Sequence, residues 1–168
     1  FRVHGYFHNP NIHPLLEFRK RAKAVRTFQQ CDPIQIDFDE EYGLETFLTQ
    51  VRPLEPGRCA RCHALRLAAT ARRAAALGIA SFTTTLLVSQ QQNHDSVRRA
   101  GQAAAEQTGL TFIVRDFRPL AKPSRDAAAS RRLYIQNYCG CVFSEYERYR
   151  DTTRELPKPH TRQERPAQ

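Results

Sequence analysis

The sequence predicts an α/β protein in which short strands alternate with helices. Short runs rich in β-branched and aromatic residues are separated by longer stretches whose apolar residues recur at helical spacing. Glycine directly follows two of the helical stretches, at Gly78 and Gly109, where a C-terminal cap belongs. This layering is typical of a sheet covered by helices.

The same patterns place the elements in chain order. Strands are expected at 3–7, 34–38, 80–85 and 110–114. Helices are expected at about 15–25, 42–51, 60–77, 96–108 and 127–138, with Leu44, Phe47 and Leu48 facing inward in the second of them. Residues 1–150 are therefore expected to form a single α/β domain. The segment 151–168 has three prolines, many charges and almost no apolar residues, so a disordered polar tail is expected there.

Charge and hydropathy narrow the class of partner. The 168 residues include 26 Lys and Arg against 17 Asp and Glu, and the isoelectric point is near 9.8. Basic side chains gain affinity for a polyanion by releasing its counterions, although an ordinary basic surface is an equally good explanation. The sequence has no apolar run long enough for a membrane span and no secretory signal at its start, so we expect a cytoplasmic protein without a membrane partner.

The cysteines point to metal or redox chemistry. There are five of them, an odd number, and the paired ones lie too close in sequence to staple distant parts of a secreted fold. Cys31 stands alone near a helix end and is interpreted as a buried small hydrophobe. His63 follows one pair, but a single histidine at a helix start is usually solvated, so no role is assigned to it.

Cys59 and Cys62 form a C-x-x-C motif at the start of the expected helix 60–77. The helix dipole and the free amides there stabilise thiolates, and we expect Arg58 and Arg61 to favour them as well. This spacing suits a metal-ligand pair, and a thioredoxin-like redox pair or coincidence is the alternative.

Cys139 and Cys141 form a C-G-C motif. A disulfide between them would close a small strained ring, and a strained disulfide is easily reduced, which favours a catalytic or regulatory role over a structural one. The alternative is that they join Cys59 and Cys62 in a four-cysteine zinc site.

Polar residues follow the expected strands, where open α/β sheets form their ligand crevice. They are Asn9 and Asn11 after the first strand, Thr83, Thr84 and Thr85 after the third, and Asp116 and Arg118 after the fourth. Turn formation, helix capping and a surface ion pair explain each of them separately. Their convergence on one edge of a sheet favours a binding site, with Asp116 as the candidate proton donor.

Five motifs in order resemble the cobalamin-independent epoxyqueuosine reductases over nearly all of residues 5–149. They are Gly5-Tyr6-Phe7-His8-Asn9-Pro10-Asn11-Ile12-His13-Pro14, the C-x-x-C with Arg66-Leu67, Phe82-Thr83-Thr84-Thr85-Leu86-Leu87, Asp116-Phe117-Arg118 and Tyr138-Cys139-Gly140-Cys141-Val142-Phe143-Ser144.

The resemblance implies a Rossmann-like fold of the nucleotide-hydrolase (HUP) superfamily, with a mostly parallel sheet flanked by helices. It also implies reduction of epoxyqueuosine to queuosine at the wobble position of a tRNA anticodon, by a monomer that takes electrons from an external donor. In this family the C-x-x-C, here Cys59 and Cys62, supplies two ligands of a 4Fe-4S cluster, and an additional iron ion can lie beside the cluster. The C-G-C, here Cys139 and Cys141, is similar to the family's redox-active pair.

The sequence departs from the family pattern in one important respect. The family begins with a strand that ends in two adjacent cysteines, which complete the cluster, and this sequence contains no adjacent cysteine pair. We therefore expect a domain that lacks its first strand and helix. The rival interpretations are a zinc-stabilised RNA-binding module without catalysis and an inactive truncated homologue.

Overall fold

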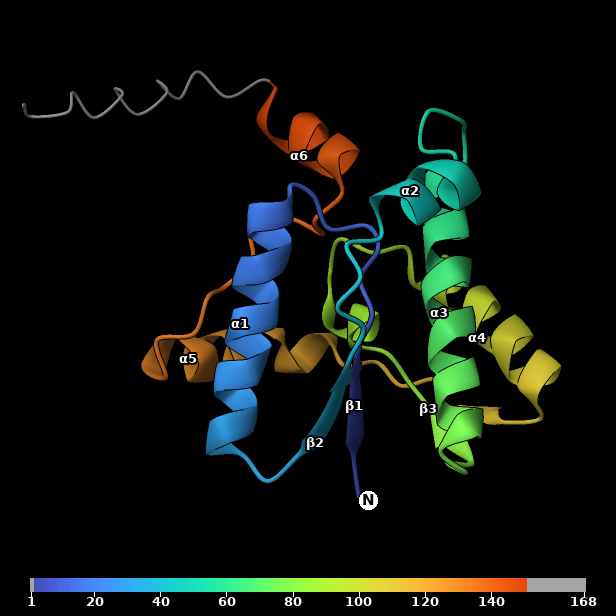
Figure 1. Ribbon diagram of the computed structural model, residues 1–168, viewed down its shortest axis with the longest axis horizontal. Helices are drawn as coiled ribbons and strands as arrows, with labels where there is room; N and C mark the ends of the chain where they lie inside the picture. Colours follow the sequence, from blue (N-terminus) through green and yellow to red (C-terminus); the bar gives the residue numbers. More distant parts are fainter. Residues whose placement is uncertain (1, 151–168) are drawn as a thin grey trace, which may run out of the picture.

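A computed structural model describes residues 2–150 of the chain, as a mixed α/β fold (Figure 1). The strands are β1 (His4–Phe7), β2 (Gln35–Phe38), β3 (Ser81–Phe82) and β4 (Thr111–Phe112). The helices are α1 (Leu15–Cys31), α2 (Leu44–Thr46), α3 (Arg58–Ala76), α4 (His94–Thr108), α5 (Ala121–Ser130) and α6 (Val142–Tyr149). A π-helical turn at Phe47–Val51 and 3-10 turns at Thr85–Val88 and Arg118–Leu120 complete the elements. The predicted tail, 151–168, lies outside the described residues.

The strands pair in parallel, as expected, but in two separate sheets. β1 pairs with β2 in the register His4 with Gln35 through Phe7 with Phe38. β3 pairs with β4 through Phe82 and Phe112. Within the described residues, therefore, two two-stranded sheets stand where the sequence predicts one. Helix α1 flanks the first pair on one side, and α3 and α4 lie on the other (Figure 1).

Three apolar clusters hold these layers together. The largest joins α3 and α4 to β3 and β4 and includes Leu67, Val97 and Phe112. A second packs α1 on β1 through Phe7 and Phe18. Complete burial of one such side chain contributes roughly 1.5–3 kcal/mol. The third cluster contains Phe47, Val51 and Cys141 and lies at the cysteine motifs.

The final predicted helix, 127–138, is wrong. Helix α5 begins earlier and ends at Ser130, and the chain then runs irregularly to Cys141 before α6 begins. Arg132 adopts a left-handed backbone conformation, with φ of 54°, and Arg21 of α1 binds the carbonyls of Tyr138 and Cys139 farther along the segment. These distant contacts override the helical pattern of the segment.

The predicted helix at 42–51 is also only partly correct. It consists of the short α2 and a π-helical turn, and the altered turn places Phe47 and Val51 in the core. Leu44 and Leu48, which were expected to face inward, are 40% and 49% exposed. None of the described helices combines the length and apolar character needed to cross a membrane.

Candidate functional site

The two cysteine motifs meet at the N-termini of two helices. Cys59 and Cys62 lie in the first turns of α3, and Cys141 directly precedes α6. Arg58 joins the two helices, because its guanidinium pairs with Glu147 and lies 5.6 Å from the centre of the Phe143 ring. Cys62 and Cys139 pack against the cluster that contains Cys141. Motifs far apart in sequence therefore form one group of thiols, and all five cysteines of the chain are free.

Burial favours the protonated form of Cys59, Cys62 and Cys141. It raises the pKa of Cys62 to about 11, and nearby Arg66 opposes this rise. Burial also raises the pKa of Cys59, where Arg58 opposes the shift as the sequence suggested. Arg61 is not among the charges that shift the pKa of Cys59 or Cys62. Its guanidinium instead donates to backbone carbonyls of the loop before α3, including that of Val51 at 2.6 Å.

The thiols fit a metal cluster only as part of its ligand set. Cys59 and Cys62 lie three residues apart on one helix and therefore face the same side. Across residues 2–150, however, no three Cys, His, Asp or Glu side chains are close enough together to hold a metal ion. The described residues place two neighbouring thiols on one face of α3, and the arrangement of the four cysteines does not match a closed four-cysteine zinc site.

The segment after β1 holds the C-G-C backbone in place. Asn11 donates from Nδ2 to the carbonyl of Cys139 at 3.0 Å, and the amide of His13 donates to the carbonyl of Gly140 at 2.8 Å. Tyr138 donates its hydroxyl to the carbonyl of His13 at 3.1 Å. Asn11 is 1% exposed, which favours positioning of the loop over the predicted contact with substrate.

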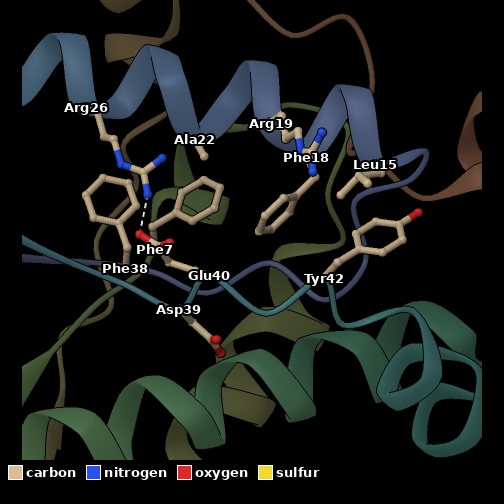
Figure 2. A pocket seen from close by; sticks show the side chains of 10 residues that line it. All are labelled: Phe7, Leu15, Phe18, Arg19, Ala22, Arg26, Phe38, Asp39, Glu40 and Tyr42. Carbon is tan, nitrogen blue, oxygen red and sulfur yellow. Dashed lines mark hydrogen bonds and ion pairs between the residues drawn. The ribbon is translucent and has the colours of Figure 1, made fainter.

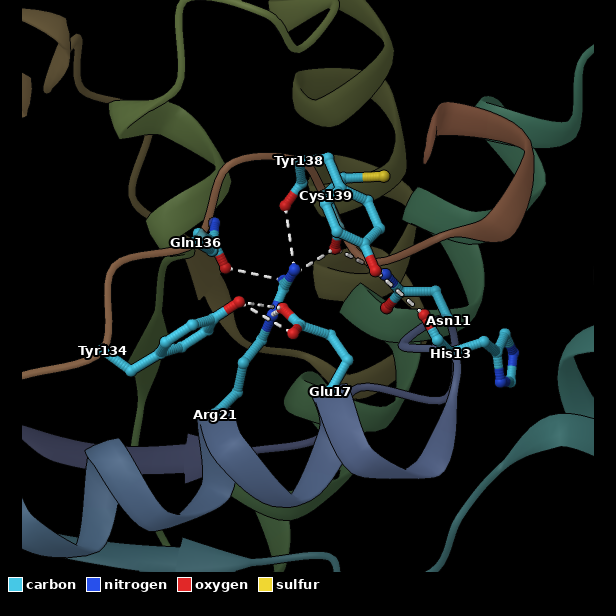
Figure 3. Close-up of polar contacts among 8 residues, drawn as sticks. All are labelled: Asn11, His13, Glu17, Arg21, Tyr134, Gln136, Tyr138 and Cys139. Carbon is cyan, nitrogen blue, oxygen red and sulfur yellow. Dashed lines mark hydrogen bonds and ion pairs between the residues drawn. The ribbon is translucent and has the colours of Figure 1, made fainter. Parts of the chain in front are cut away.

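A buried ion pair on α1 is hydrogen-bonded to the same loop (Figure 3). Arg21 donates from Nε to Glu17 at 2.8 Å, from Nη1 to the Gln136 side chain and the Cys139 carbonyl, and from Nη2 to the Tyr138 carbonyl. Sequence reasoning missed both charged residues. Their opposite charges at i,i+4 spacing beside the apolar face of the helix indicated an ion pair. Burial of that pair was not expected, because charged side chains are seldom buried.

Asn9 belongs to this site as well. Its Oδ1 accepts a hydrogen bond from Nη2 of Arg66 at 2.7 Å, and Arg66 is the cation that acts on Cys62. The Nε atom of Arg66 is buried and has no partner among the described residues. The polar residues after β1 and the C-x-x-C helix are thus directly linked.

The other predicted binding residues make local contacts. Thr83 donates to the carbonyl of Ile113 at 2.9 Å, and the Thr84 hydroxyl accepts from the amide of Leu86. Asp116 and Arg118 form an exposed ion pair at 2.7 Å, which lowers the pKa of Asp116 to about 2. Within residues 2–150, no hydrogen bond or ion pair joins these four residues to the cysteine motifs. Their local contacts are the strand-end bond, the capping bond and the surface ion pair that such residue types ordinarily make.

Two minor interpretations are corrected. His63 is buried rather than solvated, since its ring nitrogens lie 2.9 Å from Ser96 Oγ and from Gln92 Oε1 and thereby tie α3 to the α4 region. Burial lowers its pKa, so the ring is neutral at pH 7. Cys31 ends α1 in an exposed position and is not the buried hydrophobe that was expected.

A cavity lies apart from the cysteines. It measures about 520 Å³ and is bounded by α1 and the end of β2, between rings such as Phe18, Phe38 and Tyr42 (Figure 2). Arg26 stacks over Phe38 and pairs with Glu40 at its edge. No cysteine lines this cavity, and Phe7 and Phe18 are almost fully buried beneath it. The redox-capable cysteine thiols therefore lie at the meeting point of the two cysteine motifs and not in this cavity.

The fold and site together define an α/β protein in which two cysteine motifs meet beside the segment that follows β1. Comparison with known proteins makes the assignment specific, since the family model for "Epoxyqueuosine reductase QueH" matches residues 1–147. The epoxyqueuosine reductase QueH of Dehalococcoides mccartyi is 36% identical over 149 residues, covering 89% of this chain and 82% of the relative. That of Thermotoga maritima is 36% identical over 153 residues, covering 85% and 79%. The chain belongs to the QueH family of epoxyqueuosine reductases.

Relatives in this family differ in length. The epoxyqueuosine reductase QueH of Helicobacter pylori is 35% identical over 182 residues, which cover 99% of this chain but 49% of the relative. The chain therefore spans about half the length of that protein.

Proposed function

We propose that this protein reduces epoxyqueuosine to queuosine in the anticodon loop of tRNA, using Cys139 and Cys141 as a redox pair. The observation that carries the proposal is the meeting of the C-G-C and C-x-x-C motifs in one group of free thiols. Membership of the QueH family supplies the substrate. A tRNA-modifying activity is in keeping with a cytoplasmic location, and we further propose that the two strand pairs belong to a Rossmann-like sheet.

The dithiol accounts for the atoms and electrons of the reaction. Removal of an epoxide oxygen leaves an alkene and one water, and it consumes two electrons and two protons. Cys139 and Cys141 lose two electrons and two protons when they form a disulfide. Because burial raises the pKa of Cys141, this thiol holds its proton at neutral pH until the reaction removes it. An external dithiol then reduces the strained disulfide by exchange.

Cys59 and Cys62 would hold a 4Fe-4S cluster as two of its ligands. When bound, such a cluster would relay electrons singly, and an additional iron ion beside it would supply Lewis-acid polarisation of the epoxide oxygen. Arg58 and Arg66 lie next to these thiols and favour their ionised form, which is the form that binds metal.

The RNA substrate suits the charge of the chain and the position of its polar residues. A net charge of +9 favours binding to a phosphate backbone. The modified base must leave its stack to reach the thiols, and proteins read such splayed bases in single-stranded loops. We assign Asn9, Thr83, Thr84 and Arg118 to contacts with the substrate. Asp116 remains a candidate for proton transfer, and its pKa of about 2 means that it enters the reaction as a carboxylate.

Two double variants test the assignment of the cysteines. In Cys139→Ser/Cys141→Ser we expect turnover of a modified anticodon stem-loop to be lost while iron and sulfide contents after anaerobic reconstitution stay near wild type. In Cys59→Ser/Cys62→Ser we expect both iron and turnover to be lost, because the metal ligands are gone. Cys31→Ser is the matched control, since Cys31 is exposed at the end of α1, and it should change neither quantity.

The outcomes separate this proposal from its rivals. Loss of iron in the Cys139/Cys141 variant would make these residues ligands and would overturn their redox role. Colourless protein with bound zinc, RNA binding and no turnover would instead identify a zinc-stabilised RNA-binding module.

A further inference from the structure

The backbone of the C-G-C motif is fixed from one side by α1. The carbonyls of Tyr138 and Cys139 both accept hydrogen bonds from Arg21, at 3.0 Å each. Figure 3 shows the Arg21 guanidinium pointing at the inner side of this loop, and Cys139 follows Tyr138 along it. The peptide planes on either side of Cys139 are therefore held by one side chain.

Two other side chains, Glu17 and Tyr134, hold Arg21 in this orientation. Arg21 and Glu17 are each 7% exposed and form a buried ion pair. Tyr134 donates its hydroxyl to the Glu17 carboxylate at 2.7 and 2.9 Å. Burial raises the pKa of Tyr134, so it stays protonated and able to donate. These bonds orient the guanidinium, which has a rigid fork of donors.

The loop has little freedom to move away from Arg21. Gly140 has a φ of 105°, and a Cβ atom there would lie 2.7 Å from Ile12 Cγ1 and 3.2 Å from Arg21 Nη1. Its carbonyl is held by the amide of His13. Three consecutive carbonyls are thus bound while the two thiols are free and unjoined.

Formation of a disulfide between Cys139 and Cys141 requires this backbone to move. The two sulfur atoms must approach to about 2.05 Å with a restricted dihedral angle, and in a C-x-C ring this bends the intervening backbone. Bonds that hold these peptide planes in the dithiol conformation oppose that closure.

We propose that Arg21 is a positioning residue that sets the dithiol–disulfide equilibrium of Cys139 and Cys141 by holding their backbone in the dithiol conformation. The inference rests on the redox role of these cysteines in the proposed function. Arg21 acts through the loop. By stabilising the dithiol relative to the disulfide it raises the reduction potential of the pair, so the disulfide formed in each turnover is more easily reduced again by the external dithiol.

The equilibrium can be measured directly in the full chain. Protein is equilibrated anaerobically with dithiothreitol redox buffers, its thiols are alkylated, and the tryptic peptide 133–148, which carries both cysteines, is quantified by mass spectrometry. In Arg21→Lys, which keeps the buried charge but loses the fork, we expect the disulfide to gain at least about tenfold over the dithiol. Arg21→Met should shift it further. Arg26→Lys, on the same helix but paired with Glu40, is the control and should leave the equilibrium unchanged.

The Tyr134→Phe variant tests the same mechanism with a smaller risk that the protein fails to fold. It removes a support of Glu17 without disturbing the buried ion pair, and it should shift the equilibrium less but in the same direction. Folded Arg21→Lys and Tyr134→Phe proteins with a wild-type equilibrium would overturn the role of Arg21 and leave the proposed function intact. Failure of the wild type to form the disulfide in any redox buffer would overturn the redox pair itself.

Discussion

Gly140 is the residue on which the geometry of the thiol site depends most directly. Its left-handed φ of 105° and its contact with Ile12 leave no room for a side chain. We expect Gly140→Ala to lower the free energy of unfolding by more than the roughly 1–3 kcal/mol of backbone strain alone, because the methyl group also clashes with Ile12.

Gly78→Ala and Gly109→Ala are matched controls for the substitution at Gly140. Both glycines have positive φ values, of 67° and 69°, but nothing lies within 4 Å of an added Cβ. They should lose only the strain contribution. Urea denaturation measures the difference, and equal losses in all three variants would show that Ile12 moves aside.

The pKa of Asp116 is lowered mainly by one neighbour, Arg118. Hydrogen bonds from the Arg118 side chain and amide hold its pKa at about 2, since both stabilise the carboxylate. In Arg118→Gln we expect the pKa to rise toward the ordinary value near 4. A carbon-13 titration of the side-chain carboxyl group measures this. A wild-type pKa already near 4 would restore Asp116 as a direct proton donor under mildly acidic conditions.

At the scale of elements, α4 packs closely on β4 because of a glycine. A Cβ atom at Gly101 would lie 2.2–2.4 Å from the Phe112 ring. Alanine favours helix by up to about 1 kcal/mol over glycine, but overpacking costs roughly 1–3 kcal/mol, so Gly101→Ala should be destabilising. The double variant Gly101→Ala/Phe112→Leu should recover part of the loss in thermal unfolding. A double variant less stable than Gly101→Ala would contradict this packing.

Elements governed by local pattern were predictable from the sequence, and those governed by distant contacts were not. Helix α3 and the glycine after it follow the apolar period, and α4 begins only slightly earlier than expected because Asn93 caps it. Residues 127–138 look helical in sequence, yet α5 ends at Ser130, and Arg21, more than 100 residues away, binds the Gln136 side chain and the carbonyls of Tyr138 and Cys139. Likewise, motif spacing identified the cysteines, whereas the i,i+4 spacing of Glu17 and Arg21 does not show that the pair is buried, because its burial depends on the distant loop that lies on α1.

At the scale of the whole molecule, the excess of basic residues should govern binding of RNA. Each phosphate contact releases counterions, and the logarithm of affinity for single-stranded RNA falls by about 0.7 per contact for each tenfold rise in salt. About four contacts would weaken binding of an anticodon stem-loop by roughly 50-fold between about 50 and 200 mM salt. Fluorescence anisotropy at several salt concentrations gives this slope.

Two arginines allow the salt dependence to be assigned to a surface. Arg118 and Arg98 have equally exposed side chains, 51% and 50%, and each pairs with a nearby aspartate. Arg118 lies in the predicted substrate surface and Arg98 on α4. Arg118→Gln should therefore reduce the slope by about 0.7, the share of one phosphate contact, whereas Arg98→Gln should leave it unchanged. An equal reduction of the slope in both variants would mean that the positive charge acts as a diffuse field over the whole chain. A slope near zero in the wild-type protein would remove the electrostatic basis for RNA binding.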